Sequence, residues 1–486
     1  MKRRTFLTVS GSAIVGTALH GLKFSRAHAT TADSSATADK SAPASGPLRR
    51  HPENPRYFCD QRGQVVYLTG SHTWNNVVDM GPSDPPPRFD FAAYLDFLCR
   101  YGHNFTRLWA WELTSWDTTA NRQKARHTVR PHPFARTGPG NALDGKPKFD
   151  LERFDPEYFQ RLRDRCEAAQ RRGLYVSVML FEGWGLQFVP DAFKFHPFHP
   201  QNNVNGIDGD VNGDGSGVEI HALASPAVTA IQERYVRKVI DTLNDLDNVL
   251  YEISNENHPP STKWQYHFID LIHKIERGKP KQHPVGMTFQ YKGGSNRALF
   301  DSPADWISPN PEGGYRDDPP AADGKKVILN DTDHLWGIGG NSTWVWKSFL
   351  RGMNPIFMDP YDGTVLGPKD DKRWDPIRHA MGVTLRLARQ IDLARMTPQN
   401  HLASSGYCLA AVPAASDNKA AASLVVFLPG GGEVEVDLSA VDGNMTAVWI
   451  DPITGAHREG GAIVGGAKRK LASAVKADSV LWLRSS

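Results

Sequence analysis

Two apolar segments of this 486-residue chain run directly into carboxyl groups that could do chemistry. The segment NVLYEIS (248–254) is followed by Asn255 and Glu256, and KVILN (326–330) is followed by Asp331 and Asp333. Two carboxyl groups cleave a glycosidic bond when one protonates the leaving oxygen and the other, ionised, attacks or stabilises the anomeric carbon. The sequence therefore predicts Glu256 and one of the two aspartates as a catalytic pair.

Aromatic and polar residues follow other apolar segments in the same way. Sugars present apolar C–H faces that stack on aromatic rings, and hydroxyl groups that need hydrogen-bond partners. Such residues would surround the catalytic pair and bind the substrate. The candidates for substrate binding are Asn255, His72, Trp74, Arg107, Trp109, Glu182, His334 and Trp336.

Alternating apolar and amphipathic segments would position these residues. The predicted strands are 64–70, 104–111, 174–185, 248–254, 284–290, 305–309, 326–331 and 354–360. The predicted helices are 89–102, 155–173, 225–246, 262–278, 341–352 and 375–391, so the region between the fifth and seventh strands is poor in helix. This order predicts the α/β class, with a (β/α)₈ TIM barrel over residues 50–400. The carboxyl ends of barrel strands share one face, where the polar residues would converge.

The pattern changes near residue 401 to short alternating strands separated by glycine-rich turns. This pattern predicts a small antiparallel β-sandwich over residues 401–486. Phe427, Trp449 and Trp482 fall on alternating strands, which favours core packing over a binding platform. We therefore expect this domain to support the barrel and to take no part in catalysis.

The quoted residues resemble the large clan of retaining (β/α)₈ glycoside hydrolases that includes cellulases, mannanases and β-galactosidases. More closely, YLTGSHTWNN, NFTRLWAWE, YEISNEN and NDTDHLWGIGGNSTWVWKSF are similar to bacterial cellulase-like proteins with a C-terminal collagen-binding-like domain, over roughly residues 50–486. The resemblance implies that Glu256 is the acid/base, that Asn255 binds the sugar 2-hydroxyl, and that an acid closing the seventh strand is the nucleophile.

The chain departs from the clan at the seventh strand, where it has aspartates in place of a glutamate. The alignment of VILND with the clan's pattern favours Asp331 as the nucleophile. Asp333 stays an alternative, because both aspartates share the parity of Val327 and Leu329. The shorter side chain also leaves open a second interpretation, a degenerate barrel that binds carbohydrate or matrix without catalysis.

The segment DGDVNGDGSGVE (208–219) has the oxygen-ligand spacing of a calcium loop. Its eighth position is Gly215 rather than an aliphatic residue, and no clean helix pair flanks it, so an EF-hand is not expected. The open alternatives are a structural Ca²⁺ loop and an acidic surface loop. No cofactor is expected for catalysis. The candidate metal ligands are Asp208, Asp210, Asn212, Asp214 and Glu219.

The N-terminal residues 1–29 have the features of a Tat-type signal peptide. Arg3 and Arg4 precede a modestly apolar run that ends in Ala-His-Ala at 27–29. Residues 30–49 are small, polar and rich in alanine and serine, which predicts a disordered linker. The sequence therefore predicts a periplasmic or secreted protein, with no membrane partner after signal removal.

Composition excludes several other classes of function. The net charge is +3 without a basic run, which argues against nucleic acid as a partner. The four cysteines form no C-x-x-C pair, so a zinc knuckle or a disulfide scaffold is not expected. The predicted partner is a carbohydrate substrate, and the sequence leaves the oligomeric state open.

Overall fold

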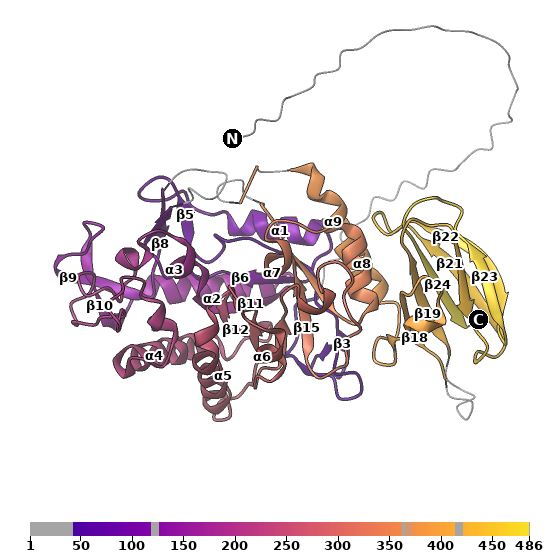
Figure 1. The fold of residues 1–486 in the computed structure, drawn as a ribbon, viewed down its shortest axis with the longest axis horizontal. Coiled ribbons are helices and arrows are strands. Elements are labelled where there is room, and N and C mark those ends of the chain that lie inside the picture. The colour runs from indigo at the N-terminus through magenta and orange to yellow at the C-terminus, as the bar shows by residue number, and fades with distance from the viewer. Residues whose placement is uncertain (1–41, 118–125, 362–365, 369–370, 414–420, 486) are drawn as a thin grey trace, which may run out of the picture. The chain divides into compact units, whose positions relative to one another are not determined.

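The computed structural model describes residues 42–117, 126–361, 366–368, 371–413 and 421–485 (Figure 1). The expected signal peptide and the first part of the expected linker lie outside the described residues. Within these residues, no helix combines the length and the apolar character needed to cross a bilayer. All four cysteines are free thiols, and only Cys99 is exposed.

Eight parallel strands form one sheet, in the order β4–β16–β15–β14–β13–β12–β11–β6. Asn104 joins the two outermost strands, because its side chain accepts a hydrogen bond from the Thr69 N–H (2.9 Å) and donates one to the Tyr67 carbonyl (2.8 Å). Gly70 permits the close approach, since a Cβ there would lie 2.1 Å from the Phe105 carbonyl oxygen. The predicted TIM barrel is confirmed. Its strands are β4 (Gly70–His72), β6 (Phe105–Leu108), β11 (Tyr175–Glu182), β12 (Val249–Asn255), β13 (Val285–Thr288), β14 (Trp306–Ser308), β15 (Val327–Asp331) and β16 (Asn354–Met358).

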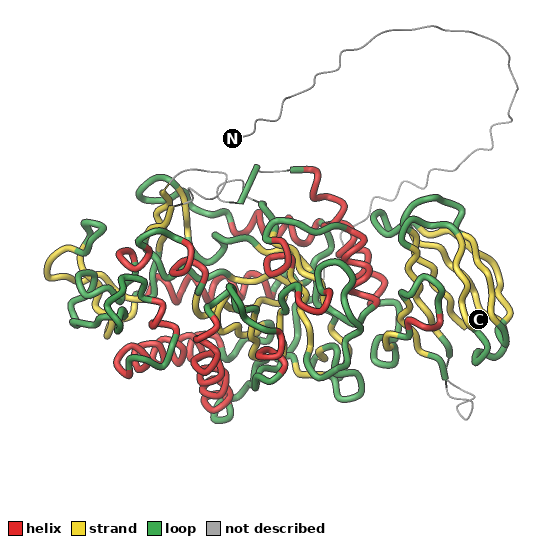
Figure 2. Tube along the Cα trace, in the orientation of Figure 1, coloured by secondary structure: helices red, strands yellow, loops and turns green. Residues whose placement is uncertain are grey.

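The six predicted helices are all present, and they surround the barrel strands (Figure 2). Local sequence explains where they begin: Asp155 accepts a hydrogen bond from the Glu157 N–H, Ser225 accepts one from the Val228 N–H, and a proline follows each cap. The long helices are α1 (Phe91–Arg100), α2 (Pro156–Gln170), α4 (Pro226–Leu243), α5 (Thr262–Glu276), α8 (Ser342–Leu350) and α9 (Asp375–Ala388). Three short helices are α3 (Trp184–Phe188), α6 (Asn296–Phe300) and α7 (Thr332–Trp336).

The predicted position of the first barrel strand is wrong. Val65–Val66 (β3) pairs antiparallel with Phe58–Cys59 (β2), which in turn pairs with Arg49–Arg50 (β1). The barrel strand β4 begins only at Gly70. Strands inserted between β4 and β11 were also not predicted: they are β5 (Asp79–Gly81), β7 (Ser115–Asp117), β8 (Arg126–Arg130), β9 (Phe134–Asn141) and β10 (Pro147–Phe154). Their apolar runs are too short to signal a strand.

Residues 42–49 correct the expectation of a disordered linker that extends to residue 49. Ala44 and Leu48 are buried in the apolar cluster that fills the amino-terminal half of the barrel. The Ala44 N–H donates to the Gln170 carbonyl (3.1 Å), and the Tyr175 hydroxyl donates to the Ser45 carbonyl (2.7 Å). Two apolar side chains and these hydrogen bonds are therefore enough to order a segment whose composition is otherwise typical of a linker.

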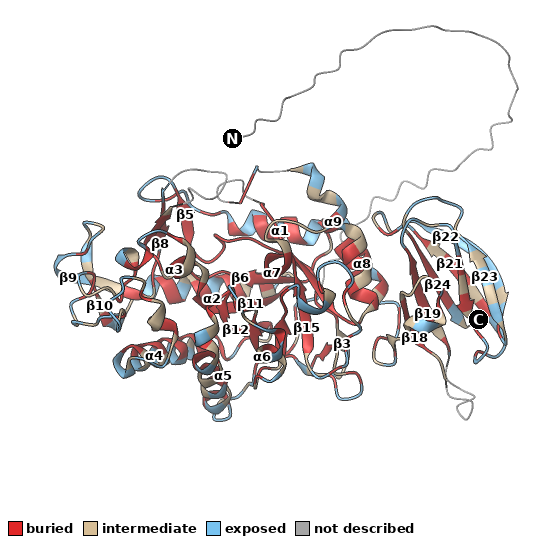
Figure 3. Cartoon of the chain, viewed as in Figure 1, coloured by how far each residue is buried: buried red, intermediate tan, exposed pale blue. Residues whose placement is uncertain are grey.

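The C-terminal residues form the predicted antiparallel sandwich. One sheet has six strands, in the order β17–β18–β19–β24–β21–β22, and the other pairs β20 with β23. Figure 3 shows that the middle strands are buried and that β22 and β23 are largely exposed. The strands are β17 (Thr397–Pro398), β18 (Cys408–Ala411), β19 (Ser423–Leu428), β20 (Glu433–Asp437), β21 (Asn444–Ile450), β22 (His457–Val464), β23 (Lys468–Ala472) and β24 (Ser479–Ser485).

The six-stranded sheet packs one face against the barrel helix α8. Phe427 and Trp482 belong to the same apolar cluster as the barrel core, whereas Trp449 packs on the separate core of the sandwich. The Trp346 ring lies 6.2 Å from the Phe427 ring in a stacked arrangement, and its Nε1–H donates to the Pro452 carbonyl (2.9 Å). Trp346 therefore anchors the sandwich through apolar contact and through one buried hydrogen bond.

Replacing Trp346 by alanine should lower the free energy of unfolding by about 3–5 kcal/mol, because it removes a fully buried indole. Trp346→Phe keeps an apolar ring but leaves the Pro452 carbonyl without its donor, which should cost about 1–3 kcal/mol. Urea unfolding monitored by circular dichroism measures both values. A change below about 0.5 kcal/mol for Trp346→Ala would contradict an anchoring role.

Candidate active site

A cavity of about 730 Å³ lies at the carboxyl ends of the barrel strands. Two of the predicted acids, Glu256 and Asp333, line it together with the predicted residues Trp74, His334 and Trp336. The other aromatic residues in its wall are Trp184, Phe188, Phe289 and Tyr291. The cavity therefore combines buried carboxyl groups with flat apolar surfaces, as a sugar-binding site requires.

Glu256 directly follows β12 and has an unusual backbone. Its φ is +43°, in the left-handed region that costs a non-glycine residue of order 1–3 kcal/mol. The surrounding chain holds this conformation: the Gln187 side chain donates to the Glu256 carbonyl (2.7 Å), and Gly183 lets Asn257 approach, since a Cβ at Gly183 would lie 2.5 Å from the Asn257 Cα. The strain is thus located at the residue predicted to be the acid.

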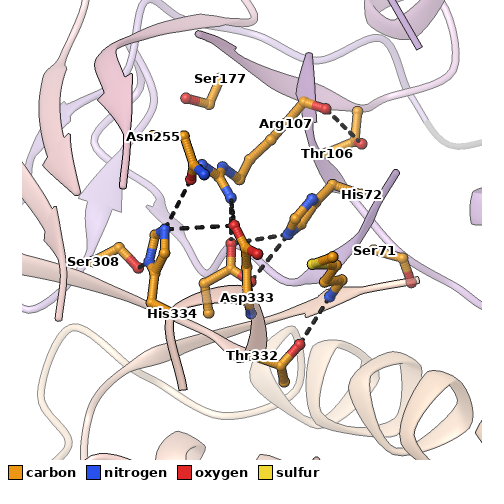
Figure 4. Close-up of polar contacts among 12 residues, drawn as sticks. Ser71, His72, Thr106, Arg107, Ser177, Asn255, Ser308, Thr332, Asp333 and His334 are labelled. Atoms are coloured by element: carbon orange, nitrogen blue, oxygen red, sulfur yellow. Dashed lines mark hydrogen bonds and ion pairs between the residues drawn. The ribbon is translucent and has the colours of Figure 1, made fainter. Parts of the chain in front are cut away.

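The Arg107 guanidinium contacts side chains from several elements, and Figure 4 shows it beside Asn255 and Asp333. It donates to both carboxylate oxygens of Glu252 (3.0 and 2.5 Å) and to Asn255 Oδ1 (2.6 Å). Its Nη1 donates to Asp331 Oδ2 (3.0 Å) and to Asp333 Oδ2 (3.2 Å). Arg107 therefore fixes the positions of four polar side chains from β12, β15 and α7.

The two aspartates of the seventh strand have different surroundings. Asp331 ends β15, is 1 % exposed and does not line the cavity. It accepts hydrogen bonds from His72 Nε2–H (3.0 Å), from Arg107, and from the Asp333 N–H (3.0 Å) at the start of α7. Asp333 lies in the first turn of α7 and faces the cavity. Because the strand ends at Asp331, its side-chain alternation does not extend to Asp333.

The pKa values of the three acids differ because their neighbours differ. Burial raises the pKa of Glu256 well above its usual value, and the charges of Asp333 and Glu182 raise it further. Burial also raises the pKa of Asp333, to about 6, although Arg107 opposes the shift. Burial acts on Asp331 as well, but His72 and Arg107 hold its pKa well below the ordinary range. Glu256 is therefore the carboxyl that retains a proton most readily.

Asn255 and His334 form a second chain of hydrogen bonds at the base of the cavity (Figure 4). His334 Nε2–H donates to Asn255 Oδ1 (3.1 Å), so its Nδ1 accepts from the Ser308 hydroxyl (2.7 Å). Burial lowers the pKa of His334 to about 3, so the imidazole is neutral. Asn255 Oδ1 accepts hydrogen bonds from both His334 and Arg107, and these two contacts fix the orientation of the side-chain Nδ2 of Asn255.

Five of the eight predicted substrate-binding residues do not line the cavity: Asn255 and Arg107, described above, and His72, Trp109 and Glu182. His72 and Trp109 are buried behind it with their rings stacked at 5.6 Å, and the Arg107 guanidinium lies 4.9 Å from the Trp109 ring. Glu182 accepts hydrogen bonds from the Trp184 N–H (2.6 Å) and the Gly185 N–H (2.9 Å) at the start of α3. Burial raises the pKa of Glu182 to about 8. It therefore positions the aromatic wall on α3.

The prediction missed several residues of this site. Trp184 and Phe188 come from α3, and Phe289 and Tyr291 follow β13. The position after a strand end would have identified Trp184 and Phe289. Glu252, the buried partner of Arg107, is the one charged residue of the segment 248–254, and a charge within a strand expected to be buried is the signal that could have identified it.

The candidate calcium loop brings three of its five predicted ligands together. The carboxylate oxygens of Asp210, Asp214 and Glu219 lie within 4.8 Å of one another. The Asn212 amide donates to Asp214 (3.1 Å) and to Glu219 (2.6 Å), and Asp208 accepts from the Asp210 N–H (3.0 Å) outside this group. A short 3₁₀ helix (Val218–His221) follows the loop, as expected for a loop that is not an EF-hand. Calcium binding stays a prediction.

The comparisons with known proteins agree with this architecture. A family described as "Domain of unknown function (DUF6298)" matches residues 127–292. No curated protein matches the chain. A solved structure titled "Glycoside hydrolase" has a TM-score of 0.57 and 14 % identity, and the match covers 91 % of this chain and 97 % of that chain. A glycoside hydrolase family 5 structure from Bacteroides vulgatus ATCC 8482 has a TM-score of 0.57 and 12 % identity, with 90 % and 93 % covered. The similarity of fold to glycoside hydrolases is confirmed.

Replacing Asp333 by asparagine should lower the pKa of Glu256 more than Asp331→Asn does, because Asp333 is the acid whose charge raises it most. Carbon-13 NMR titration of glutamate-labelled protein would follow the Glu256 carboxyl, and the signal missing in Glu256→Gln would assign it. A larger decrease in Asp331→Asn would show that Asp331 is the partner. Circular dichroism should accompany both variants, because Asp331→Asn breaks a buried ion pair.

Calcium added after chelation should raise the melting temperature if the loop at 208–219 binds it, because a ligand that binds only the folded state stabilises that state. Asp210→Asn should abolish this increase, whereas Asp208→Asn, outside the converging group, should retain most of it. Differential scanning calorimetry with and without calcium measures the effect. An unchanged melting temperature in the unsubstituted protein would identify an acidic surface loop without a metal.

Proposed function

We propose that this chain is a glycoside hydrolase that acts with retention of anomeric configuration, with Glu256 as acid/base and Asp333 as nucleophile. The observation that carries the proposal is one cavity lined by two carboxyl groups whose surroundings give them different pKa values. Such a difference lets one carboxyl hold a proton while the other is ionised. The fold shared with solved glycoside hydrolases supports the same conclusion.

The two carboxyl groups would act in two steps. In the first, Glu256 gives its proton to the glycosidic oxygen while the Asp333 carboxylate attacks the anomeric carbon. The glycosidic bond breaks, the leaving sugar departs, and a covalent glycosyl ester of Asp333 remains. In the second, ionised Glu256 takes a proton from water, which attacks the same carbon and releases Asp333. Arg107 contacts Asp333 Oδ2 and so favours the carboxylate form that attacks.

The remaining residues would bind the sugar rings. Trp74, Trp184 and Trp336 offer apolar faces for stacking. The Asn255 amide, oriented by Arg107 and His334, would donate a hydrogen bond to the 2-hydroxyl, as the resemblance implies. The substrate is therefore a poly- or oligosaccharide, and the reaction requires no cofactor.

We also propose that the protein works outside the cytoplasm, after export through the twin-arginine route. The support is the sequence of residues 1–29. The C-terminal sandwich would hold the barrel through Trp346, and its resemblance to collagen-binding-like domains stays a prediction.

Glu256→Gln should lower kcat on natural glycans by about 10²–10⁴-fold, because the variant has no proton to give. Proton NMR of the anomeric signals during early turnover should show a product with the configuration of the substrate. The double variant Glu256→Gln/Gln265→Glu is a control for the position of the carboxyl group. It should stay inactive, because Gln265 is buried on α5 and does not line the cavity. An inverted product would contradict Asp333 as nucleophile, and bound glycan without turnover would favour the non-catalytic interpretation.

The pH dependence of kcat/KM should be bell-shaped. Asp333 must be ionised, so activity should fall as the pH decreases below its pKa of about 6, which is far above the ~3.9 of an ordinary aspartate. Glu256 must be protonated, so activity should fall again as the pH rises above its raised pKa. An acidic limb near pH 4 would indicate that the nucleophile lies outside this buried environment.

A further inference from the structure

Positive charge lies in the wall of the cavity and beside it. Of the described side chains that line the cavity, Arg316 is the one cation. Lys292 lies close by: its Nζ is 4.7 Å from the centre of the Phe188 ring, and both Phe188 and the neighbouring Tyr291 line the cavity. Glu256 and Asp333 are the two carboxyl groups among the described side chains of this lining. The cations therefore have a place in the wall of the site that hydrolysis does not explain.

The two cations come from loops that follow neighbouring barrel strands, β13 and β14, and hydrogen bonds tie these loops together. Asn296 Oδ1 accepts from the Asn310 N–H (2.9 Å), and Asn310 Nδ2 donates to the Gly294 carbonyl (3.0 Å). Glu312 accepts from the Asn296 N–H (2.8 Å). Lys292 itself has a φ of +54°, which is rare for a lysine. These contacts hold together the two loops that carry the cations.

Nearby acids leave most of this charge available to a ligand. Glu312 uses its carboxylate on the backbone of the neighbouring loop. Asp317 contacts only Arg316 Nε, at 3.3 and 3.4 Å, and both side chains are exposed, which makes their pairing weak. Within the described residues, Lys292 has no carboxylate within ion-pair distance of its ammonium group. The terminal nitrogens of Arg316 have no acceptor in the same described part.

We propose that Arg316 and Lys292 bind an acidic group of the glycan, either a carboxylate or a sulfate ester, so that the substrate class is an anionic glycan. This inference rests on the proposed glycoside hydrolase function, because it assigns a substrate class to the same cavity. A planar guanidinium pairs with two oxygens of a carboxylate or sulfate, and the lysine adds a second charge. The aromatic residues of the same cavity wall would hold the sugar rings.

Calorimetric titration of the Glu256→Gln protein tests binding without turnover. One pair of probes is an oligogalacturonate and its carboxyl-reduced form, and the other is a sulfated galactan oligosaccharide and its desulfated form. We expect the acidic member of at least one pair to bind about tenfold tighter or more. Arg316→Gln should remove most of this preference and Lys292→Gln part of it. Lys468→Gln, an equal change of charge on the sandwich, should leave it intact.

The outcomes separate this inference from the proposed function. The probe pair that shows the preference identifies carboxylate or sulfate as the ligand. No preference in either pair, or a preference that survives in the double variant Arg316→Gln/Lys292→Gln, would overturn the inference. Both residues are exposed, so these variants should fold. Binding of acidic probes that depends on Arg316, with no hydrolysis by the unsubstituted protein, would overturn the hydrolase function and retain the anion site.

Discussion

The buried guanidinium of Arg107 is the interaction on which the candidate site depends. It reaches from β6 to carboxylates on β12, β15 and α7, and it is 2 % exposed. Removing a charge from water costs several kcal/mol, so such a group persists only when its partners are well placed. Glu252 accepts from Nε and Nη2, along one edge of the guanidinium, and leaves Nη1 for the two aspartates. The barrel core thereby determines where the cavity acids lie.

One cation cannot neutralise all the acids that surround this cavity. Asp331 has contacts from both Arg107 and His72, and its pKa is held low. Among the described residues, Arg107 donates no hydrogen bond to Glu256, and burial with neighbouring acids raises the pKa of Glu256. Contact with both His72 and Arg107 therefore lowers the pKa of Asp331, whereas burial raises the pKa of Asp333 and of Glu256. The same constraint that stabilises the core also gives the two different acids that glycoside hydrolysis needs.

The barrel was predictable from sequence because strands buried on both faces are almost continuously apolar, as in VILND and NVLYEIS. The first strand was misplaced because GSH at 70–72 has little apolar character, and its position depends on Asn104 and on the missing Cβ of Gly70. The strand ends identified Glu256, Trp74 and Trp336. The sequence could not show that the side chains of Glu182, His72 and Trp109 point away from the cavity, because their orientation follows from tertiary contacts with α3 and Arg107.

The replacement of a strand-end glutamate by aspartates does not remove a carboxylate from this cavity. Asp331 occupies the strand end, where it binds Arg107 and accepts the Asp333 N–H as the cap of α7. That cap begins a helix one residue later, and the first turn of the helix brings Asp333 to the cavity. An aspartate side chain is shorter than a glutamate side chain, and the first turn of α7 compensates by placing the Asp333 backbone closer to the cavity. One aspartate thus serves the core and the other faces the cavity, so the absence of a strand-end glutamate does not by itself imply a degenerate barrel.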